Sequence, residues 1–121
     1  MACYENSVNT SQGKTAKLFV CATNNGINVD VSLKGQPGDT KVIRGYVQLI
    51  LEEANQYEAW VQVSSQNEGL WADSTVKDKT ARIVHSYISG KSLVRVIAKI
   101  YSDANYKYLI STASTNGFIR E

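Results

Sequence analysis

Apolar and polar residues alternate along most of this chain with a period of two. The clearest run is residues 27–33, in which every second residue is apolar, namely Ile27, Val29, Val31 and Leu33. This is the period of a half-buried β-strand. A similar run covers residues 16–22, and the Asn-Gly pair at residues 25–26 tolerates the positive φ that a tight turn demands. Residues 16–33 are therefore predicted to form a β-hairpin, which a loop at residues 35–39 follows.

Residues 42–63 are the ambiguous part of the pattern. Between residues 45 and 58 the apolar positions fit a helical stripe nearly as well as a strand, and residues 49–54 favour helix. Residues 57–63 alternate cleanly, however, and residues 53–56 are polar enough for a turn. We predict two strands here, with one helix as the alternative. A further loop is predicted at residues 66–69, and the segment from Trp71 to Val76 carries no clear pattern.

The alternation returns in the last third of the chain. Residues 81–88 and 94–101 have the strand period, with turns predicted at residues 89–92 and 102–105. The second turn leads into a hairpin partner at residues 106–113. Residues 111–116 are small and polar, which predicts a frayed strand or a tail. The sum is about eight strands in a single all-β antiparallel domain over residues 1–121, and its size favours a β-sandwich of two sheets over a closed barrel.

Three of these segments carry a resemblance to a known group of proteins. They are residues 41–50, residues 59–63 around Trp60, and residues 92–101. From Thr40 onward the arrangement resembles the small secreted immunoglobulin- or fibronectin-like β-sandwich proteins of Gram-positive bacteria. The resemblance implies an extracellular, immunoglobulin-like sandwich with Trp60 in a central strand pair and no catalytic residues. The part of the chain before Thr40, which holds both cysteines, has no counterpart in that group.

Charge and hydropathy exclude two kinds of partner. The 13 basic and 11 acidic side chains give a net charge of +2, which is too small for the phosphate neutralisation that nucleic-acid binding requires. No apolar run approaches the ~20 residues of a membrane helix, so no membrane span is expected. The pattern of a signal peptide is also absent from the chain.

Cys3 and Cys21 are the only cysteines. An even number in a small domain suits one disulfide, here joining the first strand to the second. The alternative is two reduced thiols, with Cys21 as a small core residue. A disulfide would favour a secreted protein, because such bonds persist in oxidising compartments.

Signatures of catalysis are lacking. The Gly-Lys-Ser of a phosphate loop occurs at residues 90–92, but His85 stands where that motif requires its first glycine. His85 is the only histidine and falls on an apolar strand face, where a partly buried core residue is the usual occupant. Its separation from Cys3 and Cys21 lacks the close spacing of structural zinc sites. We therefore expect no catalytic residue, no metal and no cofactor.

The aromatic residues are the remaining candidates for a ligand site. Trp71, Tyr101, Tyr106 and Tyr108 could form a stacking platform if they point outward, because such side chains bury much area and keep a polar group. The alternative is that the aromatic residues fill the core or cover a sheet face. The expectation is a secreted, non-enzymatic binding or adhesion module for a protein or a glycan. Its alternatives are a lectin-like carbohydrate-binding protein and a structural phage or virion surface protein.

Overall fold

The computed structural model describes residues 2–9, 15–25, 28–35, 43–73, 78–84 and 92–120, and the regular elements within these ranges are all strands. The strands are β1 (Ala2–Asn9), β2 (Thr15–Asn25), β3 (Asn28–Gly35), β4 (Ile43–Ala54), β5 (Trp60–Asp73), β6 (Asp78–Val84), β7 (Ser92–Tyr101), β8 (Leu109–Ser114) and β9 (Phe118–Arg120). The predicted all-β class is confirmed for this part of the chain. These ranges contain no helix long and apolar enough to cross a membrane.

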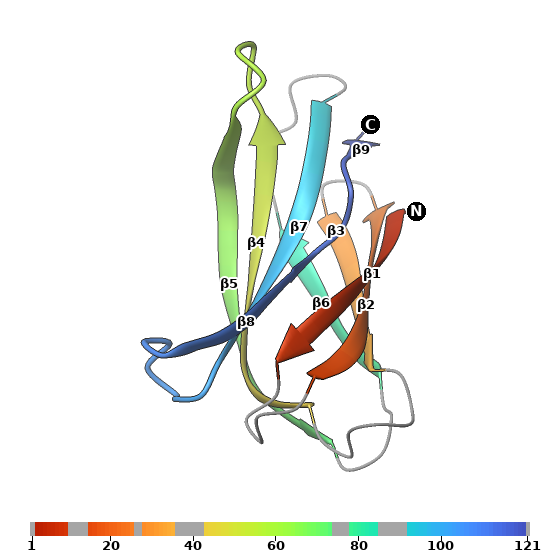
Figure 1. Ribbon diagram of the computed structural model, residues 1–121. Coiled ribbons are helices and arrows are strands. Elements are labelled where there is room, and N and C mark those ends of the chain that lie inside the picture. Colours follow the sequence, from red (N-terminus) through yellow and green to blue (C-terminus); the bar gives the residue numbers. More distant parts are fainter. Residues whose placement is uncertain are drawn as a thin grey trace.

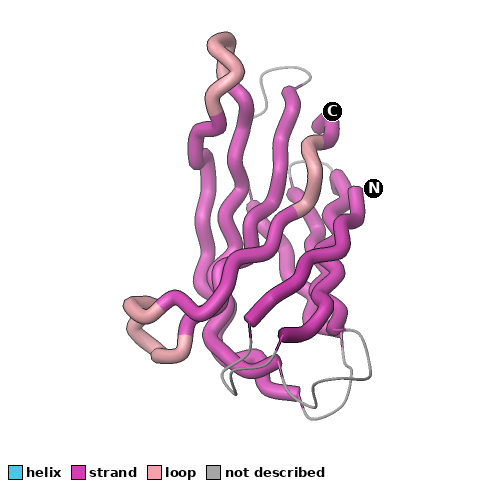
Figure 2. Tube along the Cα trace, in the orientation of Figure 1, coloured by secondary structure: helices cyan, strands magenta, loops and turns pink. Residues whose placement is uncertain are grey.

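The strands form two antiparallel sheets (Figures 1 and 2). The first sheet has the order β1-β2-β3-β6. The second has the order β5-β4-β7-β8, and β9 pairs with β7 beyond the end of β8. The prediction of two antiparallel sheets is thereby confirmed. Immunoglobulin sheets have the orders ABED and CFG, so the immunoglobulin-like part of the prediction is not confirmed.

The core lies between the two sheets and consists of the inward-facing apolar residues that the alternation marked. The largest fully buried side chains are Leu18, Leu33, Leu49, Leu51, Ile83 and Ile100. Each such side chain contributes about 1.5–3 kcal/mol through its removal from water. In β3 and β7 the burial alternates residue by residue, which is why these two strands were the easiest to predict.

Edge strands β1 and β8 meet along one side of the molecule, and hydrogen bonds of Asn6 and Asn9 join them. The Asn6 Nδ2 donates to the Ser114 carbonyl at 3.0 Å, and the Ser114 N–H donates to Asn6 Oδ1 at 3.1 Å. The Asn9 N–H also donates to Ser111 Oγ at 3.1 Å. Asn6 thus offers β8 the donor and acceptor that a neighbouring strand would offer, so that this edge of each sheet is covered.

The helical alternative for residues 45–58 is wrong, because these residues lie in β4 and in the turn that leads from β4 to β5. The turn falls at residues 55–59, later than the predicted 53–56, and Asn55 holds it. The Asn55 Oδ1 accepts from the N–H groups of Tyr57 at 2.8 Å and Ala59 at 3.0 Å. The hairpin projects beyond the rest of the sheet, at the top of Figure 1.

The predicted loop at residues 66–69 is also wrong, since these residues continue β5 as one long edge strand. The register between β4 and β5 shifts at two places, and Val63 and Glu68 are the residues without a partner opposite. Such bulges are common at sheet edges, where they bend the strand and discourage pairing with another chain. Polar residues break the alternation here because an edge strand has little surface to bury.

The frayed tail predicted for residues 111–116 is wrong as well. Ala113 and Thr115 are buried, and the Thr115 backbone and hydroxyl both bond to Val96 of β7. Small residues fit here because the chain passes at this point from β8 to β9, and β9 replaces β8 as the neighbour of β7. The predicted strand at residues 81–88 is seen as β6 up to Val84, and His85 lies outside the described residues.

Candidate functional site

Three of the four aromatic residues predicted to bind a ligand gather at one end of the second sheet. Tyr101 is the last residue of β7, while Tyr106 and Tyr108 lie in the β7–β8 loop instead of in a strand. Trp71 lies opposite Gly45 in the β4–β5 register, and its side chain is outside the description. The loop is at the lower left of Figure 1, at the opposite end of the sheet from the β4–β5 hairpin.

A row of apolar and aromatic side chains crosses the second sheet here, on the face that points away from the core. Register places Leu70 of β5 opposite Tyr46 of β4, Tyr46 opposite Tyr101 of β7, and Tyr101 opposite Leu109 of β8. The two tyrosines are half-buried, whereas Leu70 is 47% and Leu109 52% exposed. We call these four residues and Tyr106 the tyrosine face.

Tyr106 packs against the middle of the row. Its ring lies edge-on to the ring of Tyr101 at 5.6 Å between centroids and to that of Tyr46 at 6.2 Å. Its hydroxyl accepts a hydrogen bond of 2.9 Å from the Gly69 N–H on β5. Edge-to-face pairs of this kind add about 0.5–1.5 kcal/mol beyond the area that they bury. Tyr106 therefore ties the β7–β8 loop to three strands, and Tyr108, 68% exposed, is the tyrosine of this loop that faces solvent.

Asp103 holds the same loop from its other side. Its carboxylate accepts from the N–H groups of Tyr108 at 2.8 Å, Lys107 at 3.0 Å and Asn105 at 3.2 Å. These bonds, that from Tyr108 first, lower the pKa of Asp103 below its ordinary value of 3.8, because they favour the charged form. Tyr106 has a positive φ of 56°, which the bonds on both sides of it maintain.

The effect of Asp103 on stability should depend on pH. A lowered pKa means that the folded state favours the carboxylate, so the contribution is complete above the ordinary pKa and is lost as pH falls through the folded value. We expect Asp103→Ala to lower the Tm at neutral pH and the difference from wild type to shrink below pH 3.8. Thermal unfolding between pH 2 and 7 measures this.

Asn55→Ala is the matched control for that experiment. Asn55 makes similar bonds to the β4–β5 turn with a neutral amide, so its effect on Tm should not vary with pH in the same way. A constant Tm difference for Asp103→Ala down to pH 2 would contradict the role of the charged carboxylate.

Polar side chains form the next row along the second sheet. Register places Asn67, Gln48, Lys99 and Thr112 side by side on the outer face. The Gln48 Nε2 donates to Asn67 Oδ1 at 2.9 Å. This bond leaves the Gln48 Oε1 as an acceptor and the Asn67 Nδ2 as a donor, next to the tyrosine face. We call these four residues the polar row.

An ion pair lies at the opposite end of the same outer face. The Arg95 Nε donates to Glu52 Oε1 at 2.7 Å, and the Arg95 guanidinium lies 4.3 Å above the ring of Trp60. Trp60 is half-buried, so it covers a sheet face, which is one of the alternatives set out for the aromatic residues. The Arg95 charge and the Trp60 ring thus have partners within the sheet.

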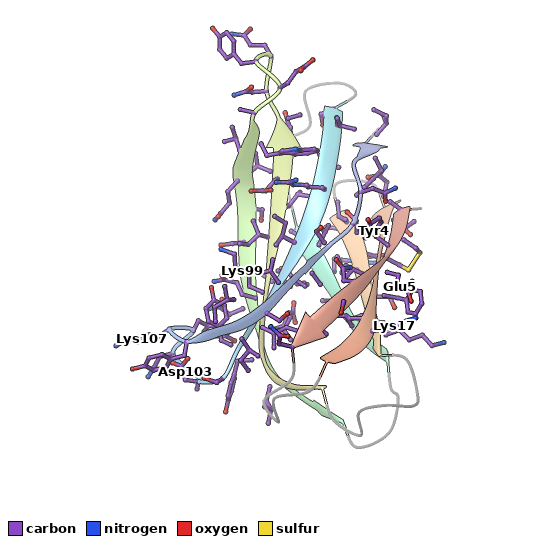
Figure 3. The ribbon with its side chains drawn as sticks, in the orientation of Figure 1. Tyr4, Glu5, Lys17, Lys99, Asp103 and Lys107 are labelled. Atoms are coloured by element: carbon purple, nitrogen blue, oxygen red, sulfur yellow. A yellow bond between two sulfur atoms is a disulfide. The ribbon has the colours of Figure 1, made fainter. Side chains whose placement is uncertain are left out.

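The predicted disulfide lies on the first sheet. Cys3 and Cys21 stand directly opposite each other on β1 and β2, with their Cα atoms 4.0 Å apart, and are joined. The bond is drawn in yellow in Figure 3, near Tyr4 and Glu5. Neither sulfur is therefore a thiolate that could bind zinc. Within the described ranges, no group of three His, Cys, Asp or Glu side chains is placed to hold a metal ion.

A shallow depression of about 500 Å³ adjoins the disulfide on the outer face of the first sheet. Asp30 and Arg82 line it and pair with each other, with Arg82 Nε 2.6 Å from Asp30 Oδ1. The hydrogen bond and the charge of Asp30 raise the pKa of Arg82. The two charged groups that line the depression therefore pair with each other.

Sequence reasoning missed Tyr46, Leu70 and Leu109 of the tyrosine face, and also Tyr57. Tyr46 is two residues from Gln48 and therefore points to the same outer face of the strand, but its neighbour across the sheet, Tyr101, lies far along the chain. Tyr57 was assigned to a strand and is instead 79% exposed at the tip of the β4–β5 hairpin.

Comparison with known proteins found no similarity on which to base an assignment: no protein-family model matches the chain, and no curated protein or solved structure matches it either.

Proposed function

We propose that this chain is a non-enzymatic binding or adhesion module and that the tyrosine face is the surface that it presents to its partner. The observation that carries the proposal is the row from Leu70 to Leu109, which runs across all four main strands of the second sheet. Antiparallel sheets usually place polar residues on the face that is turned away from the core. An apolar row on that face is typical of a surface that a partner covers.

The construction of the site supports this proposal. Tyr106 is held by two rings and by the Gly69 N–H, and Asp103 organises the loop that carries it. A surface that is ordered before it meets its partner loses less conformational entropy on binding. The disulfide is consistent with an oxidising, extracellular location.

A carbohydrate-binding role is the second candidate, and the polar row favours it. Gln48 and Asn67 present one free acceptor and one free donor beside aromatic rings. Sugars offer hydroxyl groups that both donate and accept, together with apolar ring faces that pack on aromatic side chains. The tyrosine face and the polar row combine these two properties on adjacent rows.

The test is a double variant, Leu70→Ser with Leu109→Ser, probed against a printed glycan array and against immobilised fibronectin, fibrinogen and collagen. Both leucines are exposed, so the fold should survive. We expect the wild-type chain to bind at least one probe and the variant to bind about tenfold more weakly, as for loss of a central apolar contact. A signal confined to the array would select the carbohydrate role.

The matched control is Leu93→Ser with Ile119→Ser. These residues are paired across β7 and β9 on the same outer face, with exposures of 40% and 51%, and lie at the other end of the sheet. Equal losses in the two double variants, or no binding to any probe, would overturn the proposal. Light scattering on the same samples addresses a structural role, since a wild-type oligomer that Leu70→Ser with Leu109→Ser dissociates would make the partner another copy of the chain.

A further inference from the structure

Lys99 is the charged residue of the polar row, and on the outer face of β7 its side chain is next to that of Tyr101. It is half-buried, and its neighbours across the sheet, Gln48 and Thr112, are both neutral. Among the described residues, no carboxylate lies within ion-pair distance of the Lys99 ammonium group. Lys17, Arg82 and Arg95, by contrast, each have a carboxylate within that distance. Removing an ammonium from water without a counter-ion costs free energy.

Two acidic groups among the described residues near the tyrosine face already accept hydrogen bonds. The Asp103 carboxylate accepts three backbone N–H groups of the β7–β8 loop. Glu68, at a bulge of β5, accepts from the Gln66 side-chain amide. A second lysine, Lys107, is exposed in the loop, and Figure 3 shows Lys99 and Lys107 both in the left part of the molecule. Asp103 and Glu68 keep their negative charges, but in the described part of the chain neither lies within ion-pair distance of Lys99 or Lys107, so these two ammonium groups have no ion-pair partner there.

We infer that the ligand of the tyrosine face is a saccharide that carries an acidic group, a carboxylate or a sulfate, and that Lys99 is the residue that pairs with this group. The inference rests on the proposed function and names its ligand class. The rings of Tyr46 and Tyr101 would pack against the sugar, the free acceptor of Gln48 and donor of Asn67 would bond its hydroxyls, and Lys99 would supply the charge. An acidic peptide meets the charge equally well but does not need a paired donor and acceptor for hydroxyl groups.

The experiment compares two forms of one polymer, polygalacturonate and its fully methyl-esterified derivative, which has the same backbone without the charge. Chondroitin sulfate with its carboxylates esterified, and the same esterified polymer after desulfation, form a second pair in which sulfate is the only acidic group, so that the two pairs together separate sulfate from carboxylate recognition. Retardation of the whole chain in native gels that contain each polymer gives the dissociation constant. The variants are Lys99→Gln, Tyr101→Ala, and Lys17→Gln as the matched control on the first sheet, where Lys17 pairs with Glu5.

We expect the wild-type chain to bind the acidic form of at least one pair more tightly than its neutral form. Lys99→Gln should weaken binding to the acidic form by about tenfold, the usual effect of losing a charge-assisted hydrogen bond, and leave the neutral form unaffected. Lys17→Gln changes the net charge by the same amount as Lys99→Gln and should alter binding to neither form of the polymer. Tyr101→Ala should weaken binding to both forms.

Other outcomes would overturn the inference in distinguishable ways. If both forms bound equally and only Tyr101→Ala lost binding, the tyrosine face would remain the binding surface, but its ligand would not need an acidic group. Equal losses in Lys99→Gln and Lys17→Gln would show attraction by net charge alone. No retardation in any gel, together with binding of an acidic peptide such as poly-glutamate that Lys99→Gln abolishes, would replace the saccharide by a protein partner. Circular dichroism of each variant establishes that a loss is not a loss of fold.

Discussion

Replacement of both Cys3 and Cys21 by serine is expected to lower the free energy of unfolding by about 3 kcal/mol, the value for release of a closed loop of this length in the unfolded chain. The two residues are 18 positions apart. Urea denaturation of the double variant, and of the wild-type chain with dithiothreitol, measures the loss. The two samples should agree, because both lack the same cross-link.

The way in which β1 is attached explains why this loss should be a large fraction of the total free energy of unfolding. β1 buries only Ala2 and Val8, while Tyr4 on the same face is 52% exposed, so apolar burial contributes little to its attachment. Amide exchange in the reduced chain should accordingly be fastest in β1. A loss under 1 kcal/mol, or uniform exchange across the first sheet, would show that β1 is held by its hydrogen bonds to β2 and by Asn6 alone.

Gly45→Ala is expected to destabilise the fold by about 1–3 kcal/mol, the cost of adding atoms to a closely packed site, and to disturb the tyrosine face. A Cβ at Gly45 would lie 2.5 Å from Ile100 Cγ2 and 2.8 Å from the Tyr101 carbonyl oxygen. Ile100 is β-branched and rotates little about χ1, and the second obstacle is backbone. The β4–β7 pair must therefore separate locally, which moves Tyr46 relative to Tyr101.

Urea denaturation gives the stability of this variant, and the ring proton resonances of Tyr101 and Tyr106 report the geometry of the site. Gly117→Ala is the control, because a Cβ there meets only side chains, Leu93 Cδ1 at 3.1 Å and Trp60 Cη2 at 3.4 Å. Its cost should be smaller and its tyrosine resonances unchanged. If Gly45→Ala were as stable as wild type, close contact between β4 and β7 would not be what requires glycine at this position.

Where a strand is central and half-buried, the sequence pattern was sufficient to predict it. Residues 28–35 and 92–101 have the alternation that their burial later shows, since one face of each strand lies on the core and the other on solvent. The hairpins that join β2 to β3 and β7 to β8 were predicted for the same reason. The pattern failed in β5, an edge strand that buries little, and at Ala113 and Thr115, which are buried although small or polar.

The candidate site was predictable only in part. Tyr101, Tyr106 and Tyr108 were candidates from their residue type and their closeness in sequence. That Tyr106 packs on two other tyrosines, and that Lys99 lies between the neutral residues Gln48 and Thr112, follows from pairing between strands of the sheet. No local pattern contains this information, because residue type says which groups are present and not which lie opposite each other.

The amino-acid sequence by itself determined the all-β class, because the alternation of apolar and polar residues depends on neighbours a few residues apart. The tertiary structure alone decided that Cys3 faces Cys21 and that Leu70, Tyr46, Tyr101 and Leu109 form one row. Register causes this difference: a shift of one residue between two strands would turn every outward side chain inward, and the packing of the whole core selects which register is formed.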